Sequence, residues 1–268
     1  MRTGPRKLSA VLLPRDRVAI AAALLATCAI AWLLLFYQAS MMAHMDWSAM
    51  PADSESAMPA AHPLAVELAL LLVMWASMMA AMMLPGINPM VAAFAAINRR
   101  RRQRDAPHVA TAVFVSGYLI AWSGFGAIAA GLQVLLTRLG LLSPMMQATS
   151  PALTAGLFLL AGLYQLSPLK DRCLMLCRSP IGFVLSQWRD GELGAVIMGV
   201  RHGIYCIGCC GALMLLLFAV AVMDLRWVAA LSLLLTAEKL LPRPHLWRRL
   251  IAAALILLGL WLGAALLV

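Results

Sequence analysis

The sequence predicts an all-α fold, a polytopic bundle of about seven transmembrane helices. First, the 268 residues are 63% hydrophobic and 12% charged, whereas soluble domains carry about 25% charged residues. Second, several apolar runs reach the length of about 20 residues with which a helix crosses a bilayer. Third, most of the 21 Lys and Arg residues lie in alternate connections between these runs. This positive-inside pattern indicates a cytoplasmic N-terminus.

The first apolar run, residues 18–39, follows a basic segment at 1–17. It is longer than the 7–15 apolar residues of a signal peptide, so we expect a retained membrane anchor. The second run, 64–84, should end or bend at Pro85 and Pro89, because proline cannot continue a regular helix.

A basic stretch at 98–108 precedes the third run, 109–136. Such a stretch could bind nucleic acid or anionic lipid. Its place between two spans favours an inner-face anchor, so we expect a lipid bilayer and no nucleic acid as partner. Further spans are predicted at 148–166, 227–241 and 250–268. Another span is predicted in the apolar run that contains residues 199–214 and continues to about Met223.

These spans divide the chain into four parts. They are a basic cytoplasmic N-terminus (1–17), a first span with an outer loop (18–63), a membrane core (64–249) and a C-terminal span (250–268).

The fifth run contains a cysteine cluster within residues 199–214. On a helix, His202, Cys206 and Cys210 share a face at i, i+4 and i+8, with Cys209 beside them. A single cysteine is commonly a small buried residue. Three of them with a histidine indicate a metal site or thiol chemistry, because thiolate and imidazole bind soft or borderline metals.

The second run is rich in methionine, with Met78, Met79, Met82 and Met83 in one short stretch. Methionine commonly fills irregular gaps in helix packing. Its thioether is also a soft ligand for Cu(I), so both interpretations stay open.

The outer loop, residues 40–63, contains neither Lys nor Arg. Thioether and imidazole groups together suit copper, although a flexible loop of methionine-biased composition is equally consistent. The residues that could capture an ion here are Met41, Met42, His44 and Met45.

Two further cysteines occur in the inner loop, residues 167–192. Cys173 and Cys177 are spaced i, i+4, and Pro168 and Pro180 bracket a helical turn that contains both. We expect this turn to supply ligands or redox-active thiols on the inner side.

The rise of about 1.5 Å per residue places Met78–Met83 and Cys206–Cys210 both about 21–28 Å from the outer ends of their spans. The two sulfur groups are therefore expected at one level. Glu238 falls within the sixth span, where a carboxylate is usually paired or functional. We expect it to pair with Arg201 or Lys239, or to face the thiols.

Several of these segments together resemble a known family, the predicted metal-binding integral membrane proteins with domain of unknown function 2182. The resemblance covers roughly residues 65–242. The matching segments are residues 75–85, 164–178 and 198–210, and the pair Glu238-Lys239. Ser167 stands where the family usually has Thr, and Gly211 where it has Trp. The resemblance implies metal binding.

We therefore predict a protein of the bacterial inner (plasma) membrane that handles copper as Cu(I), with zinc as the second choice. Uptake, transfer and delivery to a cuproenzyme or metallochaperone partner are all consistent with the pattern. One alternative is a membrane thiol oxidoreductase in which Cys209 and Cys210, or Cys206 and Cys209, exchange electrons with the pair Cys173 and Cys177. The other is a scaffold with a structural metal. We expect no enzymatic activity, the oxidoreductase being the enzymatic alternative.

Overall fold

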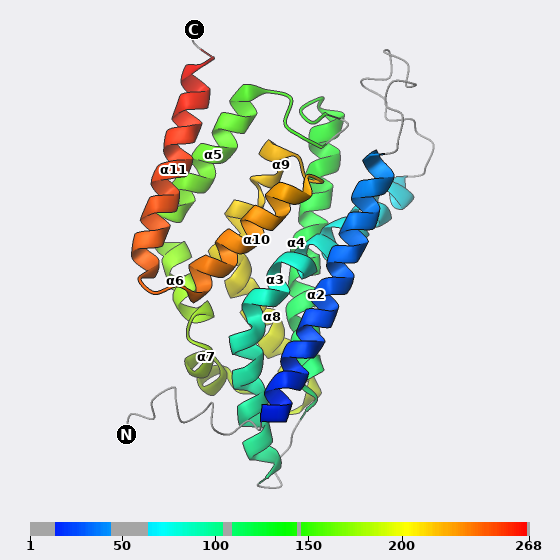
Figure 1. Ribbon diagram of the computed structural model, residues 1–268, viewed down its shortest axis with the longest axis vertical. Coiled ribbons are helices and arrows are strands. Elements are labelled where there is room, and N and C mark those ends of the chain that lie inside the picture. The colour runs from blue at the N-terminus through cyan, green and yellow to red at the C-terminus, as the bar shows by residue number, and fades with distance from the viewer. Residues whose placement is uncertain (1–13, 44–63, 104–108, 144–145, 267–268) are drawn as a thin grey trace.

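The computed structural model describes residues 14–43, 64–103, 109–143 and 146–266, and these residues form helices joined by turns. The all-α prediction is confirmed for this part of the chain. Figure 1 shows long helices that alternate in direction along the molecule. The helices are α2 (Pro14–Ala43), α3 (Leu64–Arg102), α4 (Thr111–Arg138), α5 (Pro151–Gln165), α6 (Pro168–Cys177), α7 (Pro180–Gln187), α8 (Gly191–Met214), α9 (Leu217–Val220), α10 (Leu225–Leu240) and α11 (Pro244–Ala264).

Within the described residues, five helices are long and apolar enough to cross a membrane. The number is six if α5 and α6, which meet at 66°, count as one broken span. The five segments are Val18–Met41, Leu64–Arg102, Thr111–Arg138, Gly191–Val220 and Pro244–Ala264. The remaining predicted span corresponds to α10, which has 16 residues and is therefore about 24 Å long, short of a hydrocarbon core of about 30 Å.

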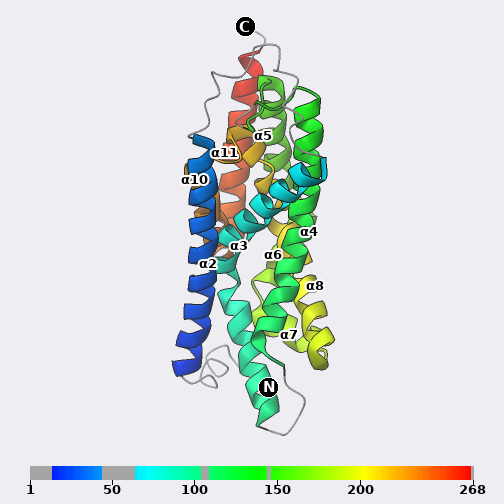
Figure 2. The same ribbon diagram turned by 90° about the vertical axis from the view of Figure 1, so that its right-hand side faces the viewer.

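Helix α3 continues through Pro85 and Pro89 to Arg102, and it changes direction along its length in both views (Figures 1 and 2). Proline lacks the N–H that would bond to the carbonyl four residues earlier. For Pro85 that carbonyl is Ala81 O, and the thiol of Cys28 on α2 donates to it across 3.4 Å. A neighbouring helix thus satisfies a backbone group that the proline releases.

Glycines allow two helix pairs to pack closely. Helix α4 packs along α8, and α5 packs along α11 (Figure 1). A Cβ on Gly199 of α8 would overlap the carbonyl oxygen of Phe114 on α4. A Cβ on Gly162 of α5 would lie 2.7 Å from the side chain of Ile256 on α11. These contacts place α4 directly against the helix that carries the cysteine cluster.

The segment predicted as an inner loop, residues 167–192, contains α6 and α7. The N-cap residue of α6 is Ser167, whose side chain accepts a hydrogen bond from Lys170 N at 3.2 Å, and Pro168 occupies the first helical position, as helix starts favour. Helix α6 packs against α8, and α7 against α3. The predicted turn with both cysteines is therefore a helix, and it lies against the span with the other three.

Candidate metal centre

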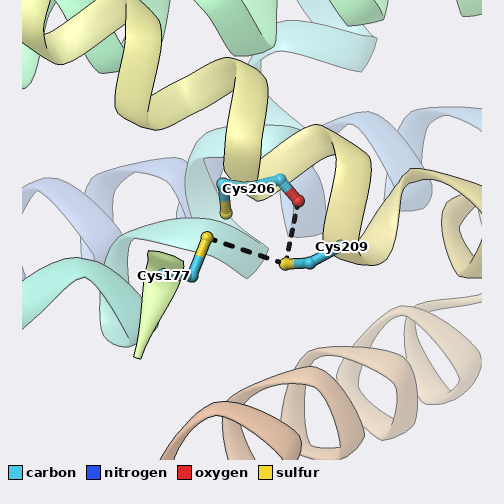
Figure 3. A group of neighbouring side chains, drawn as sticks. All are labelled: Cys177, Cys206 and Cys209. Atoms are coloured by element: carbon cyan, nitrogen blue, oxygen red, sulfur yellow. Dashed lines mark hydrogen bonds between the residues drawn. The ribbon is translucent and has the colours of Figure 1, made fainter. Parts of the chain in front are cut away.

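Three thiols converge where α6 meets α8. Cys206 and Cys209 lie one turn apart on α8, and Cys177 is the last residue of α6. Their sulfur atoms all lie within 4.8 Å of one another, and those of Cys177 and Cys209 are 3.9 Å apart (Figure 3). Cys206 and Cys209 are buried, and Cys177 is half-buried. We call these three residues the thiol triad.

The triad has the dimensions of a three-coordinate metal site. With metal–sulfur bonds of about 2.3 Å, as for zinc thiolates, three ligands in one plane around an ion lie about 4.0 Å apart. Three thiols without a harder ligand favour a soft cation such as Cu(I). Structural zinc takes four ligands in a tetrahedron, one more than the triad supplies.

A second sulfur contact lies beside the triad. The Sγ of Cys210 is 3.9 Å from the Sδ of Met83 on α3. Cys210 directly follows Cys209, but consecutive residues of a helix point about 100° apart. As a result Cys209 faces α6 and Cys210 faces α3. Both thiols also donate to the carbonyl oxygen of Cys206, at 3.1 and 2.8 Å.

Two polar side chains contact the sulfur of Cys206. The ammonium of Lys239 on α10 lies 3.1 Å from this Sγ and 3.7 Å from the Sδ of Met83. The hydroxyl of Tyr118 on α4 lies 3.2 Å from the same Sγ. Neither residue was among the site residues predicted from the sequence. A lysine near the end of an apolar run, directly after Glu238, is the signal that could have identified Lys239.

The carboxylate of Glu238 is paired differently from the prediction. Its partner is Lys170 of α6, at 2.8 Å, while Lys239 faces the sulfur atoms and Arg201 donates to Gln187 at 2.6 Å. The reason is geometric, because consecutive residues on α10 face different neighbours. The expected pair of Arg201 with Glu238 therefore does not occur, and Glu238 instead holds α6 against α10.

His202 lies outside the triad. Its buried ring stacks on Phe114 and Tyr118, with centroids 6.4 and 5.7 Å away, and meets Phe183 edge-on at 5.3 Å. Its Nδ1 has no hydrogen-bond partner among the described residues. The structure thus brings two of the four predicted α8 ligands, Cys206 and Cys209, together with Cys177, while Cys210 and His202 face other neighbours.

The other predicted residues are distributed around this centre. Met78, Met79 and Met82 are fully or almost fully buried in the core. The sulfur of Cys173 lies against Gly208, where a Cβ would be only 2.6 Å from it. Met41 is exposed near the end of α2. The side chain of Met42, and His44 and Met45, fall outside the described residues.

Comparison with known proteins identifies one family. A family model described as "PpoB2: Copper chaperone" matches residues 72–262. The match includes the triad, Met83, Cys210 and Lys239. Searches of curated proteins and of solved structures found no match.

Proposed function

The chain belongs to the PpoB2 copper chaperone family, and on this premise we propose that it is an integral membrane protein that carries Cu(I) on Cys177, Cys206 and Cys209. The observation behind this proposal is the convergence of their three sulfur atoms within 4.8 Å. Thiolates bind Cu(I) tightly and release protons as they do so. The residues would hold the ion as cargo for another protein, and they would not transform a substrate.

We further propose that the chain lies in the bacterial inner membrane, with its N-terminus in the cytoplasm and seven crossings that include α10. The five or six helices of membrane length support this arrangement. The basic C-terminal end of α3 lies at the same end of the molecule as the start of α2, α7 and the start of α8 (Figure 1). That end would face the cytoplasm under the positive-inside rule.

In this arrangement the outer loop would collect Cu(I), and the methionines of α3 would pass it by ligand exchange to the thiols. Thioethers suit an oxidising outer side, because they cannot form disulfides, and thiolates suit the reducing inner side. Cys173, one turn before Cys177 on α6, lies against Gly208 and would be a further thiol beside the triad. A cuproenzyme or a metallochaperone would receive the ion.

The metal content of the purified protein tests this function. We expect close to one copper per chain and little zinc after purification in detergent with a thiol reductant. In the wild type this copper should survive dialysis against a Cu(I) chelator. The variant Cys206→Ser/Cys209→Ser should lose its copper in the same dialysis. Cys28→Ser is the matched control, because Cys28 is a cysteine on α2 that donates to Ala81 O. Unchanged copper in the double variant would contradict the proposal.

The oxidoreductase alternative can be tested on the same purified protein. It is supported by the distance of 3.9 Å between the sulfur atoms of Cys177 and Cys209. An oxidoreductase would show redox-dependent thiol labelling with no retained metal. A chaperone should show labelling of the triad that falls as Cu(I) is added.

A further inference from the structure

We propose that Met83 and Cys210 form a second Cu(I) position, separate from the thiol triad and on the α3 side of α8. This inference rests on the proposed function, because it concerns the path of the same ion. It assigns a role to Cys210, the cysteine of α8 that is next to the triad and is not part of it.

The two sulfur atoms are close to the separation that a two-coordinate site needs. They lie 3.9 Å apart, and a linear site with bonds of about 2.3 Å would hold them about 4.6 Å apart. Methionine has three rotatable bonds, so its thioether can make this small adjustment. Both side chains are buried, at 0% and 1% exposure, so water would not compete for the ion.

A cation already lies at this place. The ammonium of Lys239 is 3.7 Å from the Sδ of Met83 and 3.1 Å from the Sγ of Cys206. It therefore contacts one sulfur of the second position and one of the triad. Lys239 thus links the sulfur of Met83 to that of Cys206, so Met83 lies next to the triad and not only against apolar side chains.

The second position would act as a transfer position. A thiolate with a thioether binds Cu(I) less tightly than three thiolates, so the ion would move from Met83 and Cys210 to the triad. During the move, bonds to Met83 Sδ and Cys210 Sγ break while bonds to the sulfurs of Cys206, Cys209 and Cys177 form. The triad thiols lose their protons, one to the Cys210 thiolate and the others to water. Copper remains Cu(I) throughout, and no electron is transferred.

Lys239 would restrict the two positions to one ion at a time. Its ammonium contacts a sulfur of each position, so two Cu(I) ions would each lie next to this charge and near the other ion. Like charges in a buried site repel strongly. The wild type should therefore bind one Cu(I) per chain and not two.

Competition titration with a Cu(I) chelator tests the second position. The variant Cys206→Ser/Cys209→Ser should still bind one Cu(I), with affinity reduced about 100-fold or more, and X-ray absorption should show sulfur ligands. Adding Met83→Leu should lower this residual affinity at least a further tenfold. The matched control is Met90→Leu in the same background, because Met90 is also on α3 and 2% exposed.

The outcomes separate this inference from the proposed function. A wild type without Cu(I) binding would overturn the proposed function. A wild type that binds, with a Cys206→Ser/Cys209→Ser variant that does not, would overturn the second position alone. Residual binding that is insensitive to Met83→Leu would do the same. Cys210→Ala in the same background provides an independent variant if Met83→Leu does not fold, and it should cause the same loss.

Discussion

The ammonium of Lys170 lies 2.8 Å from a carboxylate oxygen of Glu238, and their side chains are 0% and 2% exposed. This ion pair joins α6, which ends at Cys177, to α10. Arg178 strengthens the same junction by donating to the carbonyl oxygens of Glu238 and Leu241, at 2.8 and 2.7 Å. The pair therefore helps to hold the helix that carries the third thiol of the triad.

Breaking this pair on one side should destabilise the protein. Lys170→Met leaves a buried carboxylate without a counter-charge, which typically costs about 3–5 kcal/mol. We expect a lower Tm in detergent and weaker Cu(I) binding, since α6 would no longer hold Cys177 in place. The double variant Lys170→Met/Glu238→Leu removes both charges and should recover most of the Tm. A Lys170→Met protein with wild-type Tm would show that the pair does not stabilise the fold.

Cys177→Ser should weaken Cu(I) binding without a comparable loss of stability. Cys177 supplies one of three sulfurs and is half-buried at the end of α6, so serine fits there. We expect the affinity to fall by at least about tenfold to 100-fold, the order found when a residue that orients a metal ligand is lost, and X-ray absorption to show one sulfur fewer. Cys28→Ser should leave both measurements unchanged. Equal affinities for the two variants would exclude Cys177 as a ligand.

The close approach of α4 and α8 predicts opposite effects for two glycines. Gly199→Ala places a methyl group against the backbone of Phe114 and Tyr118, and such overpacking costs about 1–3 kcal/mol. Gly124→Ala on α4 meets no atom within 4 Å, so it should stabilise the helix by up to about 1 kcal/mol. Thermal unfolding of the two variants in the same detergent provides the measurement. A result in which Gly124→Ala loses stability and Gly199→Ala does not would contradict this packing.

Asp224 should make stability depend on pH in acid. Its carboxylate accepts hydrogen bonds from the side chain and backbone of Arg226, and these bonds lower its pKa below the usual value of 3.8. A lowered pKa in the folded state means that the contribution to stability is present above the unfolded pKa. It is lost as the pH falls through the folded pKa. The difference in unfolding between wild type and Asp224→Asn should therefore shrink below about pH 4, and a constant difference would contradict this.

Much of the fold follows from hydrophobic run length and from proline positions. The run at 109–136 corresponds to α4 (Thr111–Arg138). The two prolines around Cys173 and Cys177 predicted a helical turn, and α6 is that turn. The run at 227–241 corresponds to α10, but this helix is too short to be counted among those of membrane length, so its crossing stays a prediction.

The site was harder to predict, because one sequence does not reveal which helices are neighbours. The rise per residue predicted that Met83 and Cys210 lie at the same depth in the membrane, and the structure places their sulfur atoms in contact. Depth along the helix does not show which neighbours a side chain contacts. The ring of His202 packs against Tyr118 and Phe183 and not against the thiols. The identification of the family with domain of unknown function 2182 stays a prediction.

Glu238 and Lys239 are consecutive, yet the first binds Lys170 of α6 and the second contacts sulfur atoms of α8 and α3. Inserting one residue upstream in α10 would rotate both side chains by about 100° about the helix axis. The insertion would break the contacts of Glu238 and of Lys239 together, whereas a substitution of either residue would break only its own. The segment of α10 between Asp224 and Glu238 should therefore tolerate substitution of its apolar residues far better than any insertion or deletion.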